Sequence, residues 1–263
     1  MMYDADLSTF NCQLSTFNFS EGEILCIDKP LYWTSFTLVG RVRWAVSKYT
    51  GTKKVKVGHA GTLDPLATGV MIVCTGKATK RIEELQSGTK EYEAELCLGA
   101  VTPSFDMEHP VSETFPTEHI TKELVESVLK GFEGEQSQVP PLFSAVKVDG
   151  RRAYKYARGG EDVEIKPKTI TIEKIELLDY SMPYIKIRVA CSKGTYIRAL
   201  ARDIGKALES GAYLTGLRRT RVGDISIDKC MTFSQFKEML GQNDDDLALH
   251  DKTKQEHTGK KII

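Results

Sequence analysis

Residues 58–69 read GHAGTLDPLATG, and this stretch is the most distinctive part of the chain. Its three glycines and its proline restrict the backbone to an unusual path, so we expect a rigid loop over residues 57–69. Such a loop can hold a carboxylate, Asp64, in a cleft. The same residues also suit a tight structural turn in which Asp64 caps a nearby amide, and the loop alone leaves both interpretations open. It lacks the Gly-Lys-Ser/Thr ending of a phosphate-binding loop, and the chain shows no nucleophile elbow of a Ser/His/Asp triad.

Strand-like and helix-like segments surround this loop. The sequence predicts strands over 23–28, 70–75, 92–98, 169–178, 184–191 and 213–221, and helices over 34–49, 121–130, 195–208 and 233–240. In the first helix, Phe36, Val39, Val42 and Val46 recur at helical spacing and are expected to face the core. Strands outnumber helices and often follow one another directly. We therefore expect an α+β fold with a mixed, mostly antiparallel central sheet flanked by helices and loops.

Three regions differ in character along the chain. Residues 1–20 contain the repeated pentapeptide LSTFN and are expected to form a flexible extension. Residues 21–240 carry the strands and helices and are expected to form one folded domain. Residues 241–263 form a polar tail that includes Asp244, Asp245 and Asp246. Within the domain, residues 139–160 interleave bases, aromatics, proline and glycine, which is typical of an irregular arm.

The composition excludes several classes of protein. The chain has 263 residues, of which 41% are hydrophobic, so it can form a core and is not disordered throughout. Its apolar runs are far shorter than the roughly 18 residues of a membrane span, and no secretory signal is visible, so we expect a cytoplasmic protein. The six cysteines include no C-x-x-C pair, which favours reduced, inert thiols and no metal site.

The charges are balanced overall but segregated along the chain. Lys and Arg total 36, as do Asp and Glu. Residues 29–90 and 140–222 each carry a net charge of +8, whereas residues 91–139 between them carry −9. If the two basic segments meet in the fold, they form a phosphate-binding face that the total charge hides. Ordinary solvated surface charge explains the same counts, so this point stays open.

A second candidate segment, residues 194–198, reads GTYIR and joins a predicted strand to a predicted helix. Arg198 falls in the first helical turn, where the helix dipole disfavours a cation. This placement suggests that Arg198 pairs with an acid or a phosphate. The alternative is an ordinary surface arginine.

Taken together, these motifs resemble the bacterial tRNA pseudouridine synthases of the TruB type. The resemblance covers about residues 22–232, and the loop at 58–69 is nearly diagnostic of the family. The matching segments are 27–30, 33–35, 58–69, 90–92 with Gly99, 138–141 with Ser144, Ala145 and Lys147, 194–198, and 215–220. One departure is Tyr32, at a position where the family often has glycine.

The resemblance implies a pseudouridine synthase fold with an RNA-gripping insertion, here the arm around 147–158. It implies isomerisation of uridine to pseudouridine at tRNA position 55, in the T-loop, without a metal or another cofactor. The family's essential carboxylate falls on Asp64, which could act as a nucleophile or as a base. Arg198 matches the arginine that pairs with it. The implied partner is the T-arm stem-loop of tRNA, and we expect a monomer.

Five further residues match substrate-binding positions of the family. Tyr92 matches the aromatic that stacks on the flipped uridine, Tyr196 a second pocket tyrosine, and Leu217 an apolar wall. His59 matches a histidine that fills space near the vacated base stack, although bracing of the loop is an alternative role. Lys29 is expected to support the pocket rather than to react.

Two other functions remain as alternatives. A noncatalytic RNA-binding protein could use the same fold, although it would have no need of the set Asp64, Tyr92 and Arg198. A relative of the archaeal and eukaryotic type, working in a guide-RNA complex, is disfavoured by the short chain without long basic tails. Many bacterial members continue into a small C-terminal barrel called PUA. Too few residues follow Lys229 for such a barrel, so we expect none.

Overall fold

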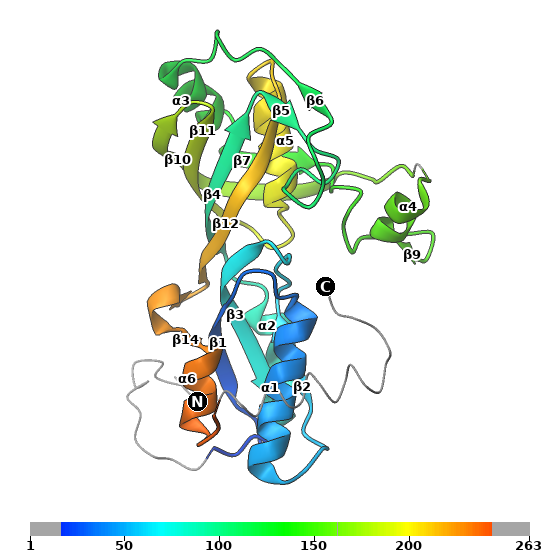
Figure 1. The fold of residues 1–263 in the computed structure, drawn as a ribbon, viewed down its shortest axis with the longest axis vertical. Helices are drawn as coiled ribbons and strands as arrows, with labels where there is room; N and C mark the ends of the chain where they lie inside the picture. The colour runs from blue at the N-terminus through cyan, green and yellow to red at the C-terminus, as the bar shows by residue number, and fades with distance from the viewer. Residues whose placement is uncertain (1–16, 162, 244–263) are drawn as a thin grey trace.

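The centre of the fold is a ten-stranded sheet in the computed structural model, which describes residues 17–161 and 163–243 (Figure 1). The strand order is β14-β1-β3-β12-β4-β11-β10-β7, with β2 added beside β3 and β13 beside β12. The strands are β1 (Ile24–Lys29), β2 (Val57–Ala60), β3 (Ala67–Thr75), β4 (Lys90–Leu98), β7 (Gly134–Gln138), β10 (Lys168–Ser181), β11 (Tyr184–Cys191), β12 (Ala212–Val222), β13 (Ile225–Ser226) and β14 (Met231–Thr232). Two small hairpins lie outside it: β5 (Ala100–Val101) with β6 (Glu113–Thr114), and β8 (Lys147–Val148) with β9 (Arg151–Arg152).

The pairing of the strands confirms the predicted mixed, mostly antiparallel sheet. Only the pairs β1–β14 and β3–β12 are parallel in the described sheet. β12 pairs with β4 along its whole length but with β3 over only three residues of β12, 217–219. As a result β12 connects two halves of an elongated molecule (Figure 1). The loop that contains Asp64 belongs to one half, and the helix that begins at Ile197 belongs to the other.

Helices cover the sheet and are capped largely as their sequences suggest. The helical segments are α1 (Ser35–Thr50), the 3-10 turn η1 (Gly76–Arg81), α2 (Ile82–Leu85), α3 (Lys122–Lys130), α4 (Ala153–Gly159), α5 (Ile197–Ala207), η2 (Ile227–Lys229) and α6 (Phe233–Met239). The Thr34 hydroxyl accepts a hydrogen bond from the Thr37 amide and so begins α1. In α1, Val39, Val42 and Val46 are buried as predicted.

The prediction for Phe36 is wrong, because its side chain is 77% exposed. The buried stripe of α1 runs through Ser35, Leu38, Val39 and Val42. Phe36 instead lies on the side of exposed Arg43, seven residues further along the helix.

The structure also refines two predicted loops. The rigid loop expected over 57–69 is the tip of a hairpin, since residues 57–60 form β2 and β3 begins at Ala67. The arm at 139–160 contains the β8–β9 hairpin and α4, and it projects from the side of the molecule (Figure 1). Strand β7 was not predicted because its sequence, GEQSQ, is polar and lies at a sheet edge.

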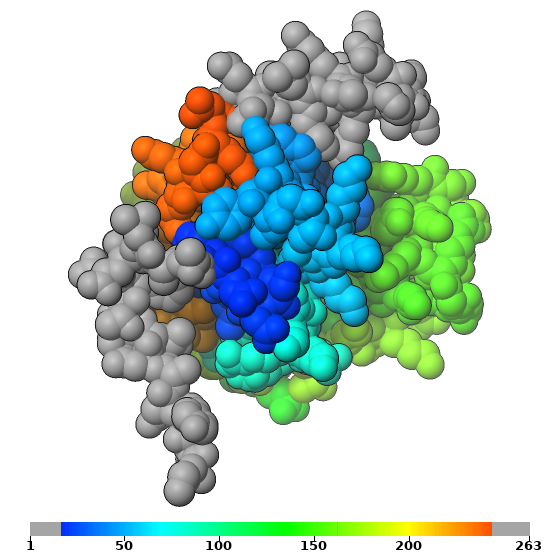
Figure 2. Space-filling model, turned by 90° about the horizontal axis from the view of Figure 1, so that it is seen from below, coloured from blue at the N-terminus to red at the C-terminus, as the bar shows by residue number. Residues whose placement is uncertain are grey.

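Folded structure begins before residue 21, the expected domain boundary. Phe19 is 1% exposed, stacks on Phe17 and contacts the rings of Tyr49 and Phe236 edge-on. Figure 2 shows these N-terminal residues beside α1 and α6 at one end of the molecule. At the other terminus, the buried Gln242 side chain donates to the Ala45 carbonyl at 2.8 Å. The remainder of the expected extension (1–16) and of the tail (244–263) lies outside the described residues. Within 17–161 and 163–243, no helix is long and apolar enough to cross a membrane.

We expect Phe19→Ala to lower the free energy of unfolding by about 3 kcal/mol, because it removes a fully buried ring from a well-packed site. Chemical denaturation of the whole chain measures this change. Phe36→Ala is the matched control, since it removes an exposed ring and should change stability by less than about 0.5 kcal/mol. Equal effects of the two substitutions would show that Phe19 does not belong to the core.

Candidate active site

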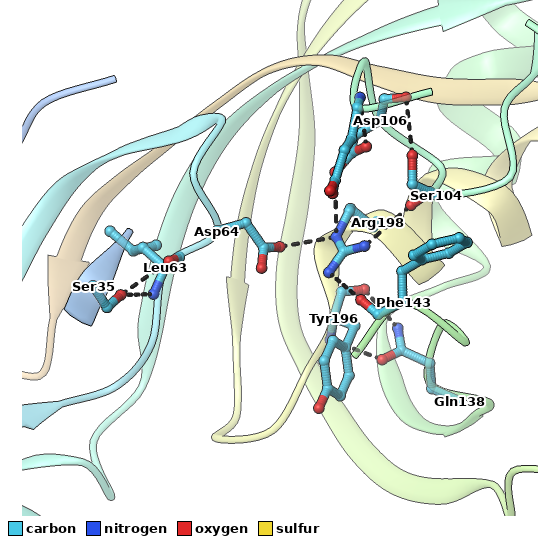
Figure 3. A network of polar contacts seen from close by, with 10 residues as sticks. Ser35, Leu63, Asp64, Ser104, Asp106, Gln138, Phe143, Tyr196 and Arg198 are labelled. Atoms are coloured by element: carbon cyan, nitrogen blue, oxygen red, sulfur yellow. Dashed lines mark hydrogen bonds and ion pairs between the residues drawn. The ribbon is translucent and has the colours of Figure 1, made fainter. Parts of the chain in front are cut away.

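Hydrogen bonds from the start of α1 hold the loop that carries Asp64. The Ser35 hydroxyl donates to the Leu63 carbonyl at 2.9 Å and accepts from the Leu63 amide at 2.8 Å (Figure 3). The Tyr32 amide donates to the Pro65 carbonyl at 2.8 Å. Both residues that flank Asp64 are therefore fixed, so the carboxylate has a defined position.

A buried arginine, Arg219, lies against two glycines of this loop, Gly61 and Gly69. Its guanidinium donates to the carbonyls of Val70, at 2.8 Å, and Gly61, at 3.1 Å. Gly61 and Gly69 both have positive φ, and a Cβ on Gly69 would overlap the backbone of Arg219. Only glycine combines this conformation with so close an approach.

Arg198 forms the ion pair with Asp64 that the sequence predicted. Its Nε lies 2.8 Å from Asp64 Oδ2, and its Nη1 and Nη2 donate to the carbonyls of Ser104 and Phe143 (Figure 3). A second carboxylate oxygen, Asp106 Oδ2, lies 3.6 Å from the same Nε. The Arg198 side chain is 6% exposed and that of Asp64 is 40% exposed. Arg198 is thus a buried cation with a partner at each of its three nitrogens, and the carboxylate that it holds is partly exposed to solvent.

Asp64 lies at a cleft of about 260 Å³ formed by its own loop, the start of β4, the β11–α5 turn and the arm. Tyr92, Tyr196 and Leu217 line this cleft, so the structure brings them together with Asp64 and Arg198. Burial raises the pKa of both tyrosines, so they are neutral rings at neutral pH. Gln138 fixes the backbone of Tyr196. Its Oε1 accepts from the Tyr196 amide at 2.8 Å, and its Nε2 donates to the Tyr196 carbonyl at 3.1 Å (Figure 3).

Lys29 and His59 do not line the cleft. Lys29 is 0% exposed, and its ammonium donates to the carbonyls of Pro30 and Trp33. The expectation that Lys29 binds substrate is therefore wrong as a direct contact, and it instead holds the turn before α1. His59 lies on β2, where burial lowers its pKa and leaves Nδ1 without a hydrogen-bond partner among the described residues.

Several residues of the site were missed by sequence reasoning. Arg219 and Lys90 both lie in matched motifs, but only the structure places them in the cleft wall. Asp106, Ser104 and the Phe143 carbonyl lie far from Arg198 in sequence, and no local pattern marks them. The described residues contain no cluster of three His, Cys, Asp or Glu side chains arranged to bind a metal ion.

The chain matches two family models that together extend over most of its length. Residues 48–197 match the TruB family pseudouridylate synthase (N terminal domain), and residues 198–252 match the tRNA pseudouridylate synthase B C-terminal domain. The chain belongs to the TruB family. It is therefore a pseudouridine synthase, an enzyme that isomerises uridine in RNA.

Other members of the TruB family are closely similar. A tRNA pseudouridine synthase B from Phocaeicola vulgatus is 64% identical over 86% of this chain and 97% of its own. One from Flavobacterium johnsoniae is 50% identical over 84% of this chain and 96% of its own. The fold also resembles a crystal structure of a Cbf5-Nop10-Gar1 complex, with a TM-score of 0.63 and 31% identity. That match covers 84% of this chain and 54% of the other, so this chain spans about half of that protein's length.

The buried Lys29 should make the stability of the fold depend on pH. Burial, opposed by the nearby Asp64 carboxylate, lowers the pKa of Lys29 from 10.5 to about 8. Between these two pH values Lys29 binds fewer protons in the folded chain than in the unfolded one, so its contribution to stability rises with pH. One pKa unit corresponds to about 1.4 kcal/mol, so the rise is on the order of 3 kcal/mol. We expect Lys29→Met to lack this rise when denaturation is measured from pH 8 to pH 10.5. Equal slopes for the two proteins would contradict a neutralised Lys29.

Proposed function

We propose that the chain converts uridine to pseudouridine at position 55 in the T-loop of tRNA, with Asp64 as the essential carboxylate. The observation that carries this proposal is the geometry of the cleft: a fixed, half-exposed carboxylate, paired to buried Arg198, beside two neutral aromatic rings. The names of the close relatives support tRNA as the substrate. The two tRNA pseudouridine synthases are 64% and 50% identical to this chain, whereas the chain matched in the Cbf5-Nop10-Gar1 complex is 31% identical, which favours a tRNA enzyme over a member of a guide-RNA complex.

The reaction is an isomerisation, so its atoms and electrons balance without a co-reactant. The bond from N1 of uracil to ribose C1′ breaks, the base turns, and C5 bonds to C1′. The proton that leaves C5 is matched by a proton gained at N1. Asp64 acts by attack on C1′, by addition to the base or by removal of a sugar proton, and all three routes use its charged form. Arg198 orients the carboxylate and neutralises its charge in the resting site.

The walls of the cleft suit a uridine that has been turned out of its stack. A base in a folded T-loop is accessible only after flipping, and its faces then need aromatic or apolar partners. Tyr92, Tyr196 and Leu217 offer these surfaces around Asp64. The arm that begins after Gln138 carries Lys147, Arg151, Arg152, Lys155 and Arg158, which would grip the RNA backbone.

The arm is coupled to the reaction centre through one hydrogen bond. The Phe143 carbonyl, which belongs to the arm, accepts from Arg198 at 2.9 Å. A change in the position of the arm therefore alters one of the groups that hold the arginine. RNA contacts on the arm can in this way affect the geometry around Asp64.

Asp64→Asn should abolish turnover while it leaves RNA binding within a few-fold of wild type, because the amide keeps the shape but loses the charge. Release of tritium from uridine labelled at C5 measures turnover on unmodified tRNA, since C5 loses its hydrogen when it bonds to C1′. Filter binding measures affinity. Turnover retained by D64N would remove Asp64 from its proposed role.

An isolated T-arm stem-loop should be modified nearly as well as whole tRNA, because the cleft and the arm contact only that part of the substrate. Deletion of residues 243–263 should leave affinity for the stem-loop almost unchanged, since Asp244, Asp245 and Asp246 repel phosphate. Comparison of Kd and KM for the full and truncated chains tests both expectations. A large loss of affinity in a truncated but folded chain would contradict them.

A further inference from the structure

One end of the cleft is built from the β11–α5 turn and the start of β4, and it is cationic. Lys193 and Gly194 are exposed at the rim of this end, and Lys90 lies in its wall beside the partly exposed Gln86. Asp64 is the only carboxylate among the residues that line the cleft in the described structure, whereas four cations line it: Lys90, Lys193, Arg198 and Arg219.

These four cations differ in how far their charge is already compensated. Arg198 is paired with Asp64, while Arg219 and Lys90 donate to backbone carbonyls and form no ion pair with a carboxylate among the described residues. Lys193 forms no ion pair with any residue of 17–161 or 163–243. Carbonyl dipoles solvate a cation but do not neutralise it, so this end of the cleft keeps an excess of positive charge.

The electrostatics of Lys90 show the effect of this excess. Burial lowers its pKa, and repulsion by Arg219 and Lys193 lowers it further. An anion that enters this end of the cleft would offset the repulsion among these cations, and this gain would strengthen its binding.

The turn that carries Lys193 is rigid. The Ser192 amide donates to the Thr171 carbonyl at 2.9 Å, and the Ser192 hydroxyl accepts from the Thr171 amide at 2.9 Å. On the other side, the Thr195 hydroxyl donates to the Ser192 carbonyl at 3.0 Å. Lys193 is therefore presented from a fixed backbone, three residues before Tyr196 in the same cleft.

We propose that Lys193, supported by Lys90, forms a subsite for one phosphodiester of the RNA strand that carries the target uridine. The inference rests on the proposed function, because it takes RNA as the occupant of the cleft. A phosphate anchored there sets how far the flipped base reaches into the cleft that Asp64 lines. Lys193 is thus a positioning residue for the substrate and has no part in the bond changes.

The test combines Lys193→Gln with a set of T-arm stem-loops in which single phosphates are replaced by neutral methylphosphonates. With the unmodified stem-loop, K193Q should raise KM and Kd about 5- to 10-fold, leave kcat unchanged, and lower the slope of log Kd against log salt by about 0.7 to 0.9. At one position, the methylphosphonate should weaken binding to wild type by a similar factor and should not weaken binding to K193Q further. That position identifies the phosphate held by Lys193.

Two further variants make the result specific. Lys193→Arg keeps the charge and should restore most of the affinity. Lys122→Gln removes the same charge from the exposed face of α3, where Lys122 pairs with Glu126, and should leave KM unchanged. An equal effect of K122Q and K193Q would reduce the subsite to general electrostatics and overturn the proposal. Three other results would also overturn it. They are a KM for K193Q equal to that of wild type, a loss in kcat alone, or affinity losses from K193Q and from the methylphosphonate that add up at every position. Failure of the wild-type enzyme to form any pseudouridine would instead contradict the proposed function.

Discussion

Arg198 reaches Asp64 across the junction between the two halves of the sheet, and this buried ion pair organises the site. A guanidinium has five N–H donors, and each one left unpaired in the interior costs about 1–3 kcal/mol. Three of these five donors have partners among the described residues: the Nε–H bonds the Asp64 carboxylate, and Nη1 and Nη2 donate to the carbonyls of Ser104 and Phe143. These partners come from three separate segments: the loop that carries Asp64, the loop after β5 and the arm. One buried arginine therefore fixes where three otherwise irregular segments lie relative to one another.

A second buried arginine explains part of the sequence of the loop that carries Asp64. Arg219 passes under the loop and uses the carbonyls of Gly61 and Val70 as acceptors. This close packing leaves no room for a side chain at Gly69. Gly69 is thus explained by packing against Arg219 and Gly61 by its positive φ, and Asp64 owes its position to that packing and to Ser35. The segment is a tight, hydrogen-bonded turn that at the same time holds a carboxylate at a cleft, so the two interpretations of this segment do not exclude each other.

The α+β class, the main helices and the pairing of Arg198 with Asp64 could be predicted, because each depends on a local pattern or on a motif. Alternation marks β4 and β11, Thr34 and Thr121 cap their helices, and a cation in the first turn of α5 requires a partner. What could not be predicted depends on contacts between distant segments. Asp106 lies 92 residues from Arg198 in sequence, and the burial of Phe19 requires the ring of Phe236. For Lys29 the motif did not indicate where the side chain points. The carbonyls of Pro30 and Trp33, which accept from its ammonium, determine this.

The basic and acidic segments of the chain meet at β4, where successive side chains point to opposite faces of the sheet. Lys90 comes from the first basic segment, and Lys193, Arg198 and Arg219 come from the second, so the two do meet at the cleft. The acidic segment begins in the same place, with Glu91 and Glu93 on either side of Tyr92. Successive side chains of a strand point to opposite faces, so while Tyr92 faces the cleft, Glu91 and Glu93 face away from it. On the far side of the sheet Glu93 is neutralised by Lys186 and Arg188. A chain with zero net charge can in this way present a cationic cleft to RNA, because Glu91 and Glu93 lie on the face of β4 opposite the cleft.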